Sequence, residues 1–259
     1  MKRFGEQRFS SIEEHINFCL DNVLAPDGTL EEIGRFYEEA AEQLRAQAIL
    51  RLLVDADVEG FAADLVTSGF ARRALLKRAA RERYDGYLLA VGRSGSVFDA
   101  LAAEAPDLAG QFLSLSPASW RPEDEYEDDF QYQRFLGLLA LGAPAAELDR
   151  AFGLLEKAAG GAGGRLEVCG ALRAKDAALF EKAFERRLEE RRSEVEEDRA
   201  LAEDDLAVAL GSKVFVEGIA TLKLARAAGL PTEREYPMCP WLALLPHPPQ
   251  QPSDPFAGS

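Results

Sequence analysis

Apolar residues recur along most of the chain at the spacing of helices that bury one face. In the first such stretch these positions are Ile12, Ile16, Cys19, Leu20 and Val23. Intervals of three and four residues place them on one side of a helix. Ser11 and Glu14 have capping-box spacing just ahead of the pattern, so we expect the helix to begin there. The Pro-Asp-Gly sequence at 26–28 predicts its end.

The pattern continues with two long helices. Thr29 and Glu32 form a second capping-box sequence, and the helix that follows is expected to run to about Ala56. A third helix is predicted over roughly 58–83. Windows that alternate apolar and polar residues are rare, and helix-forming residues dominate the composition. The chain is therefore predicted to be all-α.

The second half of the chain repeats this organisation. An apolar run that begins at Phe130 ends at Gly142, and Pro144 is placed to start the next helix. A glycine-rich connector follows at 160–164. The inward positions predicted after it include Phe180, Phe184, Leu188, Val214, Phe215, Ile219 and Leu222. We expect a helical bundle or helical-hairpin array in two packed halves, forming one domain over 1–245 that the connector could subdivide.

The C-terminal region reads as a docked loop followed by a free tail. Gly229 is placed for a left-handed helix cap, and Pro231 prevents the helix from continuing. The next segment carries apolar groups that we expect to pack onto the bundle: Tyr236, Met238, Trp241 and Leu242. The proline-rich residues 246–259 have little apolar content, and disorder is predicted for them.

The net charge of the chain limits which classes of molecule it is expected to bind. The chain of 259 residues has a formal net charge of -15. Such a surface repels phosphate backbones and anionic lipids, which argues against nucleic-acid and membrane binding. It allows a basic protein partner, although an acidic surface also serves solubility alone. No apolar signal core or membrane span is visible, so a cytoplasmic location is expected.

Side chains that carry out chemistry are few. Cys19, Cys169 and Cys239 are far apart and form no CxxC pair, so neither a disulfide framework nor a zinc site is expected. The two histidines, His15 and His247, belong to no metal or hydrolase motif. We therefore expect no catalytic residues, no cofactor and no metal, and the chain does not read as an enzyme.

Three stretches resemble a known family. They are "YEDDFQYQRFLGLLALG", "ALRAKDAALFEKAFERRLEERR" and "FVEGIATLKLARAAGLPTEREYPMCP", which lie between Asp124 and Pro240. Together they are similar to immunity family 49 of bacterial polymorphic-toxin systems. The resemblance implies a helical protein that binds and neutralises a cognate secreted toxin, without catalysis or cofactor. The alternative is a helical-repeat scaffold or regulatory protein-binding module.

One acidic stretch is the candidate partner surface. In "WRPEDEYEDDF" a proline should hold the chain in a loop, where interaction residues are commonly displayed. Its aromatic residues suit binding hot spots, and its acids suit a basic toxin such as a nuclease. The alternative is that the acids cap a helix and that Trp120 is buried. The candidate residues are Trp120, Glu123, Asp124, Glu125, Tyr126, Glu127, Asp128 and Asp129.

Overall fold

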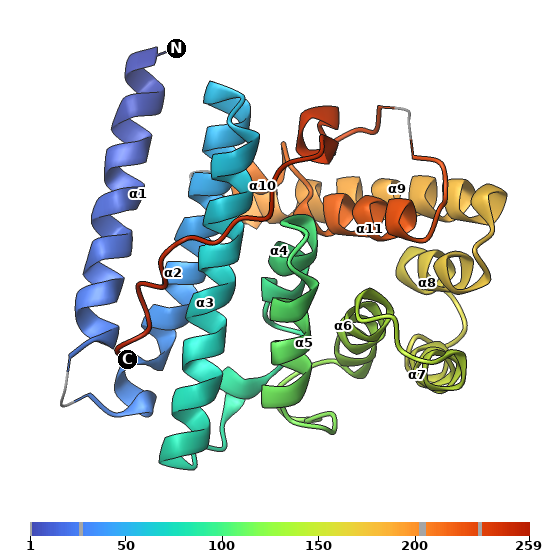
Figure 1. Cartoon of the computed structure of the whole chain (residues 1–259), viewed down its shortest axis with the longest axis horizontal. Coiled ribbons are helices and arrows are strands. Elements are labelled where there is room, and N and C mark those ends of the chain that lie inside the picture. Colours follow the sequence, from blue (N-terminus) through green and yellow to red (C-terminus); the bar gives the residue numbers. More distant parts are fainter. Residues whose placement is uncertain (1, 26–27, 202–205, 233–234) are drawn as a thin grey trace.

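The computed structural model describes residues 2–25, 28–201, 206–232 and 235–259, and their regular structure is helical (Figure 1). The elements are α1 (Lys2–Val23), α2 (Leu30–Leu50), η1 (Arg51–Asp55), α3 (Val58–Glu82), η2 (Tyr87–Leu89), α4 (Ser96–Ala102), α5 (Pro106–Leu115), α6 (Glu127–Ala140), α7 (Ala145–Ala158), α8 (Gly164–Ala174), α9 (Ala177–Leu201), α10 (Leu206–Gly211), α11 (Val216–Ala227) and η3 (Trp241–Leu244). These described ranges contain no strand, so the predicted all-α fold is confirmed. None of their helices is both long and apolar enough to cross a bilayer.

The helices form two groups, and the short helices α4, α5 and α10 each contact both of them. The long helices α1, α2 and α3 lie side by side at the left of Figure 1, while α6, α7, α8, α9 and α11 form the group at the right. The short helix α4 packs against α3 on one side and against α11 on the other. Every residue of α4 is buried, as expected for an element that lies between two groups.

A buried ion pair fixes α4 in this position. Asp99 of α4 is 0% exposed, and its carboxylate accepts hydrogen bonds from Arg45 Nε of α2 at 2.6 Å and from Ser68 Oγ of α3 at 2.7 Å. A buried carboxylate is costly unless its oxygens are paired. The pair therefore ties three helices together.

Local sequence signals hold at two helix ends. The backbone N–H of Thr29 donates to the Glu32 carboxylate at 2.9 Å, which confirms the predicted capping box at the start of α2. After α11, Gly229 has φ +83°, and the N–H of Leu230 donates to the carbonyl of Ala225 at 2.9 Å. This is the Schellman geometry that the glycine predicted.

The predicted start of α1 is wrong. The helix begins at Lys2, so Ser11 lies inside it. The reason is that no proline interrupts residues 2–10, and helical hydrogen bonding continues through them. Ser10 Oγ donates to Glu14 at 3.3 Å within the helix. Pro26 and Asp27, which were expected to end α1, lie outside the described residues.

The glycine-rich connector forms the turn between α7 and α8, which pack against each other. Gly160, Gly161 and Gly163 have φ values of +64°, +80° and +126°. Side chains other than glycine rarely adopt these conformations. The connector thus lies within the second helical group.

The predicted aromatic core of the second group is confirmed. Phe180, Phe184, Phe215 and Ile219 are all at most 5% exposed. The rings of Phe180 and Phe184 stack with centroids 5.7 Å apart, and the ring of Tyr236 meets Phe184 edge-on at 5.1 Å. The C-terminal segment therefore closes this core.

Docking of that segment differs from the prediction in one residue. Tyr236 is buried, and the N–H of Phe215 donates to the carbonyl of Met238 at 2.7 Å. Trp241, expected to dock, is instead 55% exposed. It begins the η3 turn, and that turn buries Leu244 in its place.

The tail also differs from the predicted disorder, because it packs along the first helical group (Figure 1). Phe256 is 2% exposed and lies against the ring of Tyr37, with centroids 6.1 Å apart. Asp254 pairs with Arg73 of α3 at 2.7 Å. The aromatic contact, the ion pair and a hydrogen bond from Arg81 Nη2 to the carbonyl of Ser259 at 3.0 Å hold the end. The prolines in the tail reduce the conformational entropy lost on ordering.

A buried lysine holds the start of the tail. Lys223 Nζ of α11 lies 3.2 Å from His247 Nε2 and 3.1 Å from Glu104 Oε2. Burial lowers the pKa of Lys223, although Glu104 opposes the shift. The Nδ1 atom of His247 lies 3.1 Å from the carbonyl of Pro248. The Nε2 atom of His247 also lies 3.3 Å from Glu104 Oε2, so the three side chains form one cluster.

Phe256→Ala is expected to destabilise the protein. A fully buried phenylalanine replaced by alanine costs about 3–5 kcal/mol. Gln251→Ala, an exposed change in the same tail, is the matched control. Chemical denaturation measures both, and a Phe256→Ala protein as stable as wild type means that the tail does not pack in solution.

Candidate functional site

The predicted partner surface lies where the loop after α5 enters α6. Tyr126 is the N-cap of α6, and Glu127, Asp128 and Asp129 form its first turn. Carboxylates at a helix N-terminus interact favourably with the positive end of the helix dipole. The predicted capping role of the acids therefore applies to these three. The remaining predicted residues belong to the loop itself.

The outward-facing part of this surface is centred on an aromatic ring. Tyr126 is 77% exposed. Glu123 and Asp128 are also exposed, and Glu127 is half-buried. We call these four residues, Glu123, Tyr126, Glu127 and Asp128, the acidic platform. A bare tyrosine among carboxylates can take part in a protein contact, since its ring supplies area at low entropic cost.

The other predicted residues face inward and brace the loop. Trp120 is half-buried, and its Nε1–H donates to the carbonyl of Glu125 at 2.8 Å. Glu125 is buried, and its carboxylate accepts the backbone N–H of Gly92 at 2.5 Å. A Cβ at Gly92 would lie 2.6 Å from the Cβ of Asp129, so glycine permits this approach. Trp120 and Glu125 therefore both make contacts within the protein that hold the loop.

An arginine joins the loop to the turn before η2. Arg121 Nε donates to Asp124 at 2.6 Å, and its Nη1 pairs with Asp85. Asp124 is thus also engaged within the protein. The two neighbouring loops are held together, and the acidic platform spans the end of the second loop and the first turn of α6.

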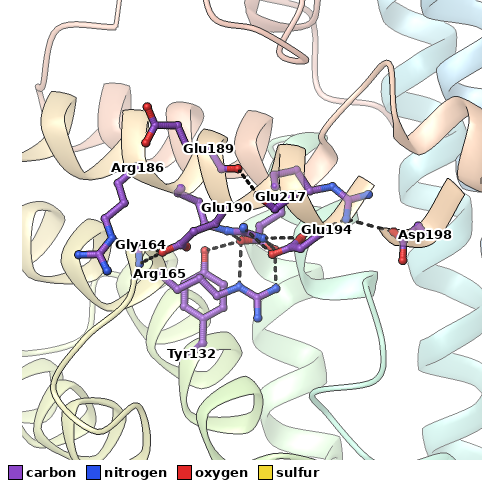
Figure 2. Close-up of polar contacts among 12 residues, drawn as sticks. Tyr132, Gly164, Arg165, Arg186, Glu189, Glu190, Glu194, Asp198 and Glu217 are labelled. Atoms are coloured by element: carbon purple, nitrogen blue, oxygen red, sulfur yellow. Dashed lines mark hydrogen bonds and ion pairs between the residues drawn. The ribbon is translucent and has the colours of Figure 1, made fainter. Parts of the chain in front are cut away.

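Asp129 connects the surface to a buried ion network, which Figure 2 shows around Glu217. Asp129 pairs with Arg165 Nη1 of α8 at 2.6 Å. The same guanidinium donates from Nη2 to Glu217 of α11 at 2.7 Å. One arginine therefore links the first turn of α6 to the interior.

Glu217 is the centre of this network. It is 7% exposed and accepts from Arg187 Nε of α9 at 2.9 Å and from the hydroxyl of Tyr132 at 3.2 Å. Burial by itself raises the pKa of Glu217, but the charges of Arg165 and Arg187 outweigh it and lower the pKa to about 2. The carboxylate stays ionised at neutral pH and cannot serve as a general acid there.

The network continues along α9. Arg187 also pairs with Glu194 at 2.8 Å, and Arg191 pairs with Glu194 at 3.1 Å and with Asp198 at 3.5 Å. A cavity of about 480 Å³ borders these side chains. Its arginines are paired with carboxylates, so the arrangement joins helices.

Scans of protein-family models, of curated proteins and of solved structures find no match to this chain. The family resemblance therefore remains a hypothesis that rests on the stretches quoted above. One of those stretches contains Glu217, which sequence reasoning passed over. The available signal was a lone acid in the apolar run "VFVEGIATL", where a buried charge needs a partner.

Replacing Glu217 by glutamine is expected to destabilise the fold strongly. The change keeps the side-chain shape but leaves Arg165 and Arg187 without their shared counter-charge. Removing one partner of a buried pair costs about 3–5 kcal/mol. Glu196→Gln, an exposed neutralisation on α9, should cost far less. Equal losses in urea unfolding would contradict the central role of Glu217.

The contribution of Glu217 should depend on pH in a defined direction. Its folded pKa lies near 2, below the ordinary 4.5. The stabilisation is therefore fully present above about pH 4.5 and declines as the pH falls towards 2. The stability difference between wild type and Glu217→Gln, measured across this range, should shrink on acidification. A constant difference would rule out the linkage.

Proposed function

We propose that this chain is an immunity protein that binds a cognate secreted bacterial toxin in the cytoplasm and neutralises it by stoichiometric protein–protein inhibition. The observation that carries the proposal is Tyr126, 77% exposed on a loop whose neighbouring residues are fixed. A preorganised loop loses little entropy on binding, so its exposed ring contributes more fully to affinity. The quoted family resemblance supports the same reading.

Charge supports a basic partner. The acidic platform places three carboxylates around Tyr126, in a chain whose formal net charge is -15. Attraction between opposite charges speeds association, whereas desolvated aromatic contacts mainly slow dissociation. A nuclease toxin, whose cleft must attract phosphate groups, fits this requirement.

The test begins by asking whether a toxin domain is encoded beside this gene, and such a domain is then used as the cognate partner. Co-expression with the chain should restore growth, and the purified chain should abolish toxin activity at a 1:1 ratio. If the chain binds the toxin but leaves it active at excess, the regulatory-module alternative replaces neutralisation. If it neither binds nor protects, the proposal is wrong.

Tyr126→Ala is expected to raise the dissociation rate by roughly tenfold, about 1.4 kcal/mol, with the melting temperature unchanged because the ring is exposed. Leu179→Ala, which removes another exposed apolar side chain (54%), is the control. Surface plasmon resonance against the toxin measures both rates. Equal rates for the two variants would place the interface elsewhere.

Reversing the outward charges should instead slow association. We choose Glu123→Lys with Asp128→Lys, because Asp124, Glu125 and Asp129 are bound within the protein. The matched control, Glu59→Lys with Asp107→Lys, makes the same change in net charge at exposed acids of other helices. Only the first pair should reduce the association rate strongly, and the reduction should fade at high salt.

A further inference from the structure

Three side chains with metal-ligand atoms converge between α1 and α2, away from the acidic platform. His15 and Cys19 are four residues apart on α1, which puts them on the same side of that helix. Glu39 of α2 faces them both. The three ligand atoms all lie within 4.8 Å of one another.

The separations are close to those of a filled metal site. His15 Nε2 lies 3.5 Å from Glu39 Oε2, and Cys19 Sγ lies 3.9 Å from the same oxygen. Tetrahedral zinc with bonds of about 2.0–2.3 Å holds its ligand atoms about 3.3–3.6 Å apart. The third separation, between the ligand atoms of His15 and Cys19, is at most 4.8 Å.

One of the three ligands is buried, and the other two are partly exposed to solvent. Cys19 is 0% exposed, whereas the side chains of His15 and Glu39 are 44% and 37% exposed. The competing partner of Glu39 is Arg35, at 4.0 Å and itself 67% exposed. Such surface pairs contribute little and are readily displaced.

We propose that His15, Cys19 and Glu39 form a Zn²⁺ site with water as the fourth ligand. A set of thiolate, imidazole and carboxylate ligands suits zinc and not magnesium or calcium, which take oxygen ligands. On binding, the Cys19 thiol releases its proton to solvent and the S–Zn bond forms, with no change of oxidation state. The ion joins α1 to α2, and this inference does not depend on the proposed function.

The site was not expected from sequence, because a search for CxxC spacing cannot detect it. Two of its ligands are local to α1, and the third comes from another helix. Burial and the nearby Glu39 carboxylate raise the pKa of the metal-free Cys19 thiol to about 11. A zinc-bound thiolate carries no proton, so metal binding displaces the proton of the Cys19 thiol.

The test is a titration of the full chain, stripped of metal, with Zn²⁺ and with Co²⁺. We expect one equivalent to bind, the Co²⁺ form to show a thiolate-to-metal charge-transfer band, and Zn²⁺ to raise the melting temperature. Cys19→Ala should remove all three effects. Cys169→Ala and Cys239→Ala, which alter the other two buried cysteines, should retain them.

Because Cys19 is buried, the Cys19→Ala variant could fail to fold, so the two exposed ligands are tested as well. His15→Gln and Glu39→Gln should keep wild-type circular dichroism while weakening Zn²⁺ binding at least tenfold. Their matched controls are His247→Gln, the second histidine, and Glu31→Gln, an exposed acid on α2. Tight binding that survives His15→Gln and Glu39→Gln, or no binding of micromolar Zn²⁺ by wild type, would overturn the site.

Discussion

The carboxylate of Glu217 needs counter-charges because it is buried, and this requirement organises the second half of the molecule. Its partners Arg165 and Arg187 come from α8 and α9, and Tyr132 comes from α6. An unpaired charge in this position costs far more free energy than the paired network contributes. Packings that separate any of these helices from α11 are therefore strongly disfavoured.

The same network reaches the surface. Arg165 binds Glu217 with one nitrogen and Asp129 with another, so the first turn of α6 is positioned from the interior. Glu125 and Trp120 fix the loop ahead of that turn. The exposed ring of Tyr126 is therefore held at the surface by contacts that continue into the core.

Much of the fold followed from local patterns. The Thr29–Glu32 box and the Gly229 cap were predicted correctly, because each depends on hydrogen bonds between residues at most five apart. The buried faces of α9 and α11 followed from helical periodicity. For the candidate surface the sequence indicated the stretch, but it could not separate the outward Tyr126 from the inward Glu125, since both lie in one acidic run.

Helical class, inward faces and the acidic character of the surface were thus encoded in neighbouring residues. Contacts between residues far apart in the sequence were decided only by the tertiary structure. Arg165 and Glu217 are 52 positions apart, Arg73 and Asp254 are 181 apart, and Cys19 and Glu39 are 20 apart. Composition predicted a disordered tail, yet Phe256 is buried against the ring of Tyr37. The physical reason is that periodicity reports which side of a helix is apolar, whereas charge pairing and docking depend on which helices become neighbours.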